Sequence, residues 1–274
     1  MLTVLIPAYN EEKQIGNTLS AYKNFMDRIQ VIVIPNGCID RTEEISKAVD
    51  DRIEVLTLTE GSKVNAINYA YKFAKFDHIL VQDADTLIEQ KSIQNVLSFI
   101  NKESYLFASL FPETNTSKSG WIVRSYYSFL SKTPEHSIGM VGSGCYLLSR
   151  KAASKCFPFP QVIADDGYVK SILDKSNLSV IPESNIHVQA PRDVISLIKI
   201  KTRSKLGNIE LSNIGKKING DKNGLLTLFI LGVKERAFIS FLIYASITAI
   251  SLGRARWYLN NNSSLKWERD NSTR

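Results

Sequence analysis

Short apolar runs alternate with amphipathic segments through the first hundred residues of the chain. Four runs, at 2–6, 31–34, 53–58 and 79–82, consist mainly of β-branched and other apolar residues, which is typical of strands buried on both faces. Apolar residues recur at helical spacing in the segments between them, most regularly over 66–74. The alternation predicts an α/β fold with a mostly parallel, doubly wound sheet flanked by helices.

The pattern continues with shorter elements and a different C-terminal end. We expect helices at 93–100, 121–130 and from 169, and strands at 105–111 and 141–148. After residue 205 the chain is basic and helical in pattern, with two apolar segments. The sequence therefore predicts an α/β domain over 1–205 and a C-terminal basic and apolar helical region over 206–274.

The second of these apolar segments raises the question of a membrane. Residues 237–253 form a run of 17 residues without a charge. At about 1.5 Å per residue this run reaches about 25 Å, less than a hydrocarbon core of roughly 30 Å. With its basic and aromatic flanks, the stretch 225–258 is expected to lie along a membrane surface. A short span and a soluble helical appendage or dimer interface are the alternatives.

Polar residues follow each of the first four strands. Because the carboxyl ends of parallel strands meet at one edge of the sheet, these residues should lie close together where α/β proteins bind ligands. Asp83 and Asp85 flank Ala84 and can converge on Mg²⁺ or Mn²⁺, which bind carboxylate oxygens together with substrate phosphates. Turn-forming aspartates are the simpler alternative. The whole expected edge contains Pro7, Ala8, Tyr9, Glu11, Asn36, Lys63, Asp83 and Asp85.

Two residues near this edge are expected to cap helices. Asn10 is expected to cap the helix after the first strand, and Ser62 the helix that follows Lys63. No GxGxxG and no GxxxxGK[ST] occurs in the chain, so neither a dinucleotide fold nor a P-loop is supported.

Composition and charge indicate a folded protein with an anionic partner. Apolar content of 44% and charged content of 22% are ordinary for a folded protein. Residues 191–274 contain 15 Lys and Arg but 6 Asp and Glu, so the formal net charge of +7 comes from the last third. A basic, partly apolar end suits an anionic partner, and a membrane surface or a phosphate-bearing substrate fits as well as nucleic acid. Three cysteines without metal-binding spacing, and a strand starting at residue 2, predict a cytoplasmic location.

Two later motifs add candidate chemistry. Gly142, Ser143 and Gly144 stand at the head of a strand, where the backbone could approach a ligand closely or form a bulge. Asp165 and Asp166 precede a helix, where they could cap it or supply a general base.

In order and spacing these motifs resemble those of glycosyltransferase family 2, the inverting enzymes with the GT-A fold. The resemblance covers about residues 1–205. Its motifs are Pro7-Ala8-Tyr9-Asn10-Glu11-Glu12, Asn36-Gly37-Cys38-Ile39-Asp40, Gly61-Ser62-Lys63-Val64-Asn65-Ala66, Asp83-Ala84-Asp85, Gly142-Ser143-Gly144 and Asp165-Asp166.

The resemblance implies a role for each position of the donor site. Pro7, Ala8, Tyr9 and Glu11 correspond to positions that hold the nucleotide base and ribose. Asn36 stands where many members have an Asp that pairs with uracil, so it departs from the pattern. The remaining donor residues would be Lys63 near the base or phosphates, Asp83 near the ribose and on the metal, Ala84 between the aspartates, and Asp85 on the divalent metal.

The acceptor side follows by the same resemblance. Gly142 to Gly144 would border the acceptor, and Asp166 takes the place of the catalytic base. Asp165 stands where Glu is commoner. Arg203 lies where relatives carry a Gln- and Arg-rich motif that contacts the diphosphate, although the strict Q-x-x-R-W form is absent. His187 is a possible third metal ligand, and a hydrogen-bonded structural His is the alternative.

The implied function is transfer of a hexosyl or N-acetylhexosaminyl group, with inversion, from a nucleoside diphosphate sugar, expected to be a UDP-sugar. The acceptor would be a carbohydrate or a lipid-linked molecule in cell-surface polysaccharide or glycolipid synthesis at the inner face of the cell membrane. Mn²⁺ or Mg²⁺ is the expected cofactor, no nucleic-acid partner is expected, and the oligomeric state is left open.

Two alternative functions are compatible with parts of these motifs. Asp83-Ala84-Asp85-Thr86 also resembles the nucleophile strand of haloacid-dehalogenase-like phosphatases, but residue 87 is Leu and three strand-helix units precede the motif. A non-catalytic, membrane-recruited binding module is the other reading, and the presence of both acidic pairs counts against it.

Overall fold

The computed structural model describes residues 1–102, 104–137, 144–173, 178–216 and 224–261. Within it the chain forms two compact units. Unit 1 contains Met1–Glu113, Gly139–Gln161 and Ile172–Val188; unit 2 contains Thr114–Ile138, Val162–Ser171 and Gln189–Arg274. The expected boundary at residue 205 lies within a helix of unit 2, α9 (Val194–Asn213).

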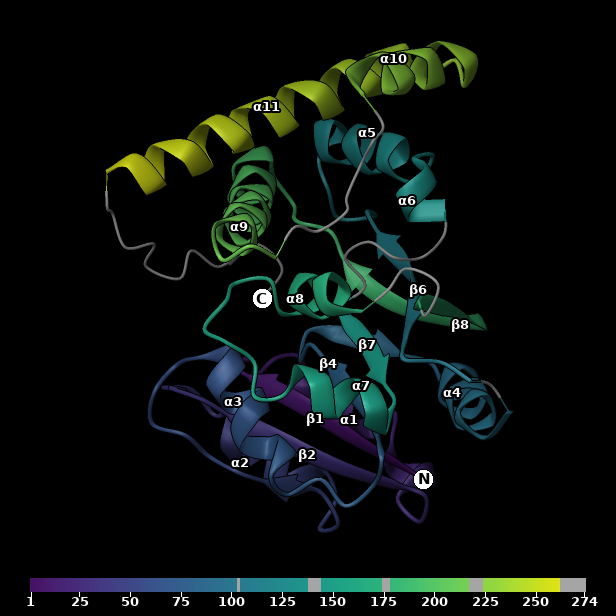
Figure 1. Cartoon of the computed structure of the whole chain (residues 1–274), viewed down its shortest axis with the longest axis vertical. Coiled ribbons are helices and arrows are strands. Elements are labelled where there is room, and N and C mark those ends of the chain that lie inside the picture. The colour runs from purple at the N-terminus through teal and green to yellow at the C-terminus, as the bar shows by residue number, and fades with distance from the viewer. Residues whose placement is uncertain (103, 138–143, 174–177, 217–223, 262–274) are drawn as a thin grey trace. The chain divides into compact units, whose positions relative to one another are not determined.

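Unit 1 is built on a mixed sheet with the strand order β3-β2-β1-β4-β7-β6-β8-β5. The first four strands along the chain are parallel to one another, as predicted, and Figure 1 labels three of them, β1, β2 and β4. They are β1 (Leu2–Ala8), β2 (Ile29–Pro35), β3 (Glu54–Val55) and β4 (His78–Gln82). Antiparallel pairing joins β7 (Cys145–Leu148) to β4 and to β6 (Phe107–Asn115), and β8 (Leu178–Gln189) to β5 (Thr86–Ile88).

Helices cover the sheet because its central strands are apolar on both faces. Every residue of β1 and of β2 is buried, so both strands need cover on each side. The core packs Leu2, Val4 and Ile6 against Ile15 and Leu19. The covering elements of unit 1 are α1 (Ile15–Ser20), the short 3₁₀ helix Lys23–Phe25, α2 (Thr42–Val49), α3 (Lys63–Tyr71), α4 (Gln90–Lys102) and α7 (Arg150–Cys156).

Two local expectations differ from the structure. The third strand is only Glu54–Val55, although Leu58 still bridges Asn36 beside β2. Asn10 does not cap a helix, because α1 begins at Ile15 and Asn10 adopts a φ of 53°. Its Oδ1 accepts a hydrogen bond from the Ile39 backbone N–H at 2.8 Å, so the residue turns one loop and ties it to another.

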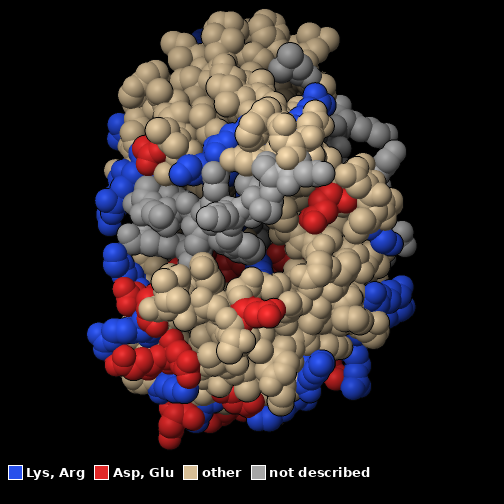
Figure 2. All heavy atoms as spheres, turned by 90° about the vertical axis from the view of Figure 1, so that its left-hand side faces the viewer, with Lys and Arg blue, Asp and Glu red and all other residues tan. Residues whose placement is uncertain are grey.

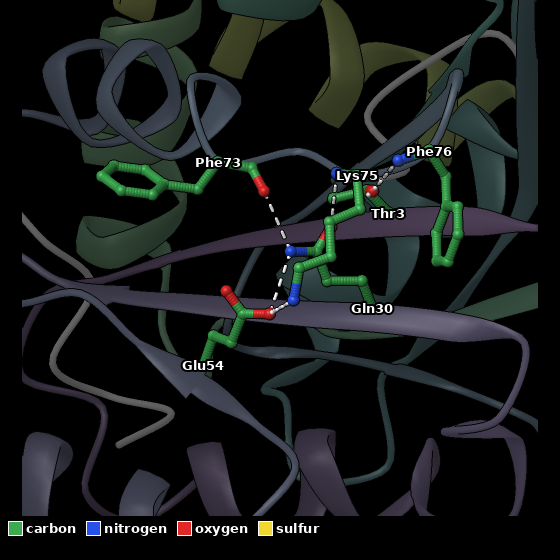
Figure 3. A network of polar contacts seen from close by, with 6 residues as sticks. All are labelled: Thr3, Gln30, Glu54, Phe73, Lys75 and Phe76. Atoms are coloured by element: carbon green, nitrogen blue, oxygen red, sulfur yellow. Dashed lines mark hydrogen bonds and ion pairs between the residues drawn. The ribbon is translucent and has the colours of Figure 1, made fainter.

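A buried polar network closes the end of the sheet where the parallel strands begin (Figure 3). Its centre is Gln30, which is buried at the start of β2. The Gln30 Oε1 accepts hydrogen bonds from Thr3 Oγ1 and from the Lys75 backbone N–H, each at 2.8 Å. Its Nε2 donates to Glu54 Oε1 and to the Phe73 backbone oxygen, each at 3.0 Å. One side chain therefore joins β1, β2, β3 and the segment after α3.

Unit 2 is helical in the described residues that lie outside β6 and β8. Its long C-terminal helix, α11 (Phe238–Asn260), packs on α9 and on α5 (Trp121–Leu130). The shared core contains Val123, Tyr126, Leu197 and Ile247. The other helices are α6 (Pro134–Ser137), α8 (Asp165–Ile172) and α10 (Leu225–Lys234).

The helix α11 is longer than the sequence suggested. Arg254 and Arg256 do not end it, and it continues to Asn260. In the described residues it is the one helix long and apolar enough to cross a membrane by length and composition. The run of 17 residues without a charge is therefore only part of a helix of 23 residues.

Candidate active site

The turn from Asp83 to Thr86 connects β4 to β5, and the surrounding structure fixes it from two sides. The Asp83 N–H donates to the Gly144 backbone oxygen at 2.7 Å, and Thr86 Oγ1 donates to the Asp83 backbone oxygen at 2.8 Å. From α1, Thr18 Oγ1 donates to the Ala84 backbone oxygen at 2.8 Å. Ala84 is buried, whereas Asp83 keeps a side chain that is 35% exposed. The turn therefore holds Ala84 in the core and Asp83 partly open to solvent.

A second, buried layer supports the same turn. The last residue of β4, Gln82, accepts a hydrogen bond from the Tyr22 hydroxyl and donates to the Thr86 backbone oxygen at 2.9 Å. Burial raises the pKa of Tyr22 well above its ordinary value, so the phenol remains a hydrogen-bond donor. Sequence reasoning missed Thr18, Tyr22 and Gln82. The one available indication was a polar Gln at the end of an otherwise apolar strand.

Gly144 is required by the same arrangement. It has a φ of 61°, a conformation that favours glycine. A Cβ on this residue would lie 2.9 Å from Thr86 Cγ2 and 3.0 Å from Asp83 Oδ2. The close approach expected of this motif is thus an approach to the Asp83 side chain. Gly142 and Ser143 lie outside the described residues.

Lys63 lies beside the first aspartate. Its Nζ is 2.7 Å from Asp83 Oδ1, and both side chains are partly buried. Ser62 caps α3 as expected, because its Oγ accepts a hydrogen bond from the Asn65 backbone N–H at 3.2 Å. The start of α3 thereby brings an ammonium group to the Asp83 carboxylate at the end of β4.

Asn36 belongs to the framework of this edge. Its Nδ2 donates to the backbone oxygens of Ala8 at 2.9 Å and Ile34 at 3.0 Å. Its Oδ1 accepts from the Ser62 backbone N–H at 3.1 Å. With both amide donors already used, this buried side chain ties the ends of β1 and β2 to the cap of α3, and it cannot donate to a ligand without breaking that framework.

The remaining donor-side residues follow β1. Pro7 and Ala8 are buried at its end, and the Tyr9 ring lies against Gly61, where a Cβ would come within 3.2 Å of Tyr9 Cε2. Glu11 is buried, and its backbone N–H donates to Thr42 Oγ1 at 2.7 Å. These contacts fix the loop after β1 against the starts of α2 and α3.

His187 has carboxylate partners other than the aspartate pair. It lies on β8 opposite Leu87, with Nε2 2.7 Å from Glu89 Oε1 and Nδ1 3.3 Å from Glu113 Oε2. In the part of the chain that the structure describes, no three His, Cys, Asp or Glu side chains are grouped to hold a metal ion. The contacts of His187 are those of a hydrogen-bonded structural His, which is the alternative considered above.

The Asp83–Asp85 turn nevertheless fits a divalent metal of the kind expected. Mg²⁺ and Mn²⁺ are commonly held by one or two carboxylates, with phosphates and water completing the shell. Asp83 is partly exposed and Asp85 is exposed, at the edge where the parallel strands end. Two accessible carboxylates at this edge are a suitable donor set for a metal that arrives with a diphosphate.

The other expected residues belong to unit 2. Asp165 is buried in the first turn of α8, while Asp166 is 43% exposed and lies 3.2 Å from Lys170 Nζ. The segment before α8 is held by α9, where Glu210 Oε2 accepts from the Ile163 backbone N–H at 2.7 Å. Arg203 is exposed on α9.

Comparison with curated proteins gives two informative similarities. The chain is 32% identical over 115 residues to an uncharacterised glycosyltransferase of Mycoplasma genitalium, which covers 38% of each protein. It is 33% identical over 93 residues to the poly-beta-1,6-N-acetyl-D-glucosamine synthase of Staphylococcus aureus. This match covers 32% of this chain and 23% of the synthase. The aligned stretches therefore cover less than half the length of these relatives.

Solved structures show the fold. Mannosyltransferase PcManGT from Pyrobaculum calidifontis, solved with GDP-Man and Mn²⁺, has a TM-score of 0.62 at 16% identity, covering 97% of this chain and 80% of that one. Glucosyl-3-phosphoglycerate synthase from Mycobacterium tuberculosis, solved with Mn²⁺, UDP and glucosyl-3-phosphoglycerate, has a TM-score of 0.56 at 17% identity, covering 80% and 82%. The fold is of the GT-A type, which confirms the expected class.

The profile of Glycosyl transferase family 2 matches residues 3–157, more than half of the chain. That range contains the loop after β1, Asn36, Lys63 and the Asp83–Asp85 turn, the edge at which the structure gathers the candidate donor-site residues. The chain therefore belongs to glycosyltransferase family 2, the nucleotide-sugar glycosyltransferases with an inverting mechanism.

Proposed function

We propose that this protein transfers a hexosyl or N-acetylhexosaminyl group from a nucleoside diphosphate sugar to a carbohydrate or lipid-linked acceptor, with inversion at the anomeric carbon. The observation that carries the proposal is the Asp83–Thr86 turn, which is held by Thr18 and Gly144 and has Lys63 2.7 Å from Asp83. Such a fixed set of charges suits a diphosphate, because the groups need not be ordered when the ligand binds.

On the donor side, each residue of unit 1 has a distinct proposed task. Pro7, Ala8, Tyr9 and Glu11 would contact the base and ribose, Asp83 the ribose and metal, and Asp85 the metal. Mn²⁺ or Mg²⁺ bound there supplies positive charge to the diphosphate leaving group. Lys63 would add a second positive charge to the phosphates, while its contact with Asp83 keeps that carboxylate in one orientation.

On the acceptor side, we propose Asp166 as the general base. An acceptor hydroxyl must lose a proton as it attacks the anomeric carbon, and a carboxylate can take it. Asp166 keeps 43% of its side chain exposed, so the carboxylate remains reachable while Lys170 holds it from within the same helix. Asp165 would support the same helix turn, and Arg203 would bind acceptor or diphosphate charge. A single displacement then inverts the configuration.

The base of the donor would be bound at the edge that contains Asn36. We propose a UDP-sugar donor. The solved proteins that share the fold were determined with GDP-Man in one case and with UDP in the other, so fold alone favours neither. Asn36 donates both amide hydrogens to backbone oxygens, which leaves only its oxygen to accept from a base.

The biological setting rests on a partial similarity. The relative from Staphylococcus aureus is a poly-beta-1,6-N-acetyl-D-glucosamine synthase, of which the match covers 23%. We propose cell-surface polysaccharide or glycolipid synthesis at the inner face of the membrane, where a lipid-linked acceptor would be found. The phosphatase alternative is set aside because the family match includes the Asp83–Thr86 turn.

Calorimetric titration tests the donor site directly. UDP, GDP and other nucleoside diphosphates are titrated into the full chain with and without Mn²⁺, and then into Asp85→Ala. We expect one diphosphate to bind only with metal and the variant to lose that binding. Asp27→Ala, which removes a carboxylate whose side chain is 95% exposed, is the matched control and should bind normally. Absence of metal-dependent binding to every diphosphate would contradict the proposal.

A further inference from the structure

The helices α10 and α11 carry an unusual concentration of exposed apolar side chains. Of the nineteen large apolar side chains exposed in the described residues, ten lie on these two helices. We call this set the C-terminal apolar surface; it consists of Leu226, Phe229, Ile230, Val233, Phe238, Ile239, Leu242, Ile250, Trp257 and Leu259. The top of Figure 2, which α10 and α11 occupy in Figure 1, carries hardly any charged side chains on the face shown. A concentration of exposed apolar side chains on two neighbouring helices is typical of an interaction site.

The opposite face of α11 is already used inside unit 2. Phe241, Ile247, Ser251 and Ala255 are buried, and they recur along the helix at spacings of four or six residues. This stripe packs on α5 and α9, over which α11 runs in Figure 1. The close contact of α10 with α11 is made at Gly232, where a Cβ would lie 2.8 Å from the Phe241 Cβ. The C-terminal apolar surface is thus a fixed part of unit 2.

This packing decides how α11 can meet a membrane. Its 23 residues would be long enough to span a bilayer. Its partner α9, however, carries four basic residues, Lys199, Lys201, Arg203 and Lys205. If α11 crossed the hydrocarbon core while packed this way, these charges would enter it, which is strongly unfavourable. Lying flat buries only the outward face of α11 and leaves α9 in water.

The charges at the ends of α11 indicate the lipid. Lys234 and Arg236 precede the helix, and Arg254 and Arg256 lie in its last two turns. Residues 225–260 contain a single acidic residue, Glu235, and it is paired with Lys132 at 3.1 Å. Basic residues around an apolar surface attract anionic headgroups, and an exposed tryptophan such as Trp257 suits the interface between headgroups and acyl chains.

We propose that unit 2 docks on an anionic lipid bilayer through the C-terminal apolar surface, with α11 lying in the plane of the membrane. This inference specifies the membrane location contained in the proposed function. Its test measures lipid binding alone, so it can fail while the transferase assignment stands, and the reverse is also true.

The test is co-sedimentation of the full chain with vesicles of phosphatidylcholine, with and without phosphatidylglycerol. We expect strong binding only when phosphatidylglycerol is present. In Ile239→Asp the affinity for these vesicles should fall by about tenfold or more, because binding no longer transfers an isoleucine side chain from water into the bilayer. The matched control is Ile195→Asp on α9, since the two isoleucines are 69% and 67% exposed within the same unit. This control should bind vesicles as the unchanged protein does.

Spin labels then distinguish the flat arrangement from a span. Labels are placed by Ile239→Cys, Ile250→Cys and Trp257→Cys in a Cys38→Ser background, in which Cys145 and Cys156 are buried. Similar immersion depths at all three positions are expected, and a deepest label at the middle of α11 would overturn the flat arrangement. Equal loss of binding in Ile239→Asp and Ile195→Asp would overturn the assigned surface. So would a lipid-free dimer that Ile239→Asp abolishes while vesicle binding persists.

Discussion

At the scale of single residues, the candidate donor site depends on Gly144 as much as on the aspartates. Its backbone oxygen accepts from the Asp83 N–H at 2.7 Å, and its missing side chain leaves room for Asp83 and Thr86. The sequence predicted a close approach here because of the glycine. It did not reveal that Asp83 would be the neighbour, since that contact depends on β7 lying beside β4 in the folded sheet.

Substitution of this glycine should impair the site. In Gly144→Ala the new Cβ would lie 3.0 Å from Asp83 Oδ2 in a backbone conformation that disfavours alanine. We expect a stability loss of about 1–3 kcal/mol by thermal denaturation, together with weaker metal-dependent binding of the nucleoside diphosphate by titration.

Gly215→Ala is the control for backbone strain, because Gly215 has a φ of 75° and none of the described residues has an atom within 4 Å of the position of a Cβ. It should lose stability without losing diphosphate binding. Normal diphosphate binding by Gly144→Ala would show that Asp83 need not stay where Gly144 holds it.

At the scale of secondary-structure elements, the sequence predicted the strands with continuous apolar patterns best. The bounds of β1, β2 and β4 were predicted within a few residues, because each strand is a continuous apolar run that is buried in the fold. The strand β3 and the end of α11 were not, because their limits depend on neighbours. Within α11, Arg254 lies 5.5 Å from the centre of the Tyr258 ring and donates a hydrogen bond to the Tyr258 hydroxyl at 3.0 Å.

The same limit applies to residues that support the site. Asp83, Asp85 and Lys63 are recognisable because their motifs are local in sequence. Thr18 and Tyr22 act on the Asp83–Thr86 turn from 60 or more positions away, so only the folded chain reveals them. Their contribution is geometric, since hydrogen bonds from α1 and from the segment after it fix the turn that presents the aspartates.

The Gln30 network gives a stability prediction for the elements that it joins. Gln30→Leu would leave Thr3 Oγ1, the Lys75 N–H and the Phe73 backbone oxygen without their partner on β2. We expect a loss of about 3 kcal/mol in the free energy of unfolding, measured by urea denaturation. Gln90→Leu, an exposed position at the start of α4, should change the unfolding free energy far less. Equal effects of the two substitutions would contradict the importance of the network.

At the scale of the whole molecule, one lysine should contribute to the pH dependence of the stability of the folded chain. Lys201 on α9 lies over the rings of Tyr126 and Tyr127 of α5, 5.3 and 5.5 Å from their centres. Burial, and to a lesser extent Lys205, lowers the pKa of Lys201 to about 8 from 10.5. His136 on α6 also faces this group, and burial and Lys201 lower its pKa too.

The sign of the effect follows from proton binding. Between pH 8 and 10.5 the unfolded chain binds more protons at this lysine than the folded chain, so the free energy of unfolding should rise with pH. The stabilisation that comes from the neutral form of Lys201 is fully present above about pH 10.5. It is lost as the pH falls through about 8. Since the pKa values of Tyr22 and Tyr126 are also shifted, the measurement compares the unchanged protein with Lys201→Met. Lys201→Met should be the more stable of the two at pH 7, and this difference should shrink as the pH approaches 9.5. Lys151→Met, on an exposed turn of α7, is the control and should leave the pH profile unchanged, whereas an equal change in both variants would rule out Lys201 as the source.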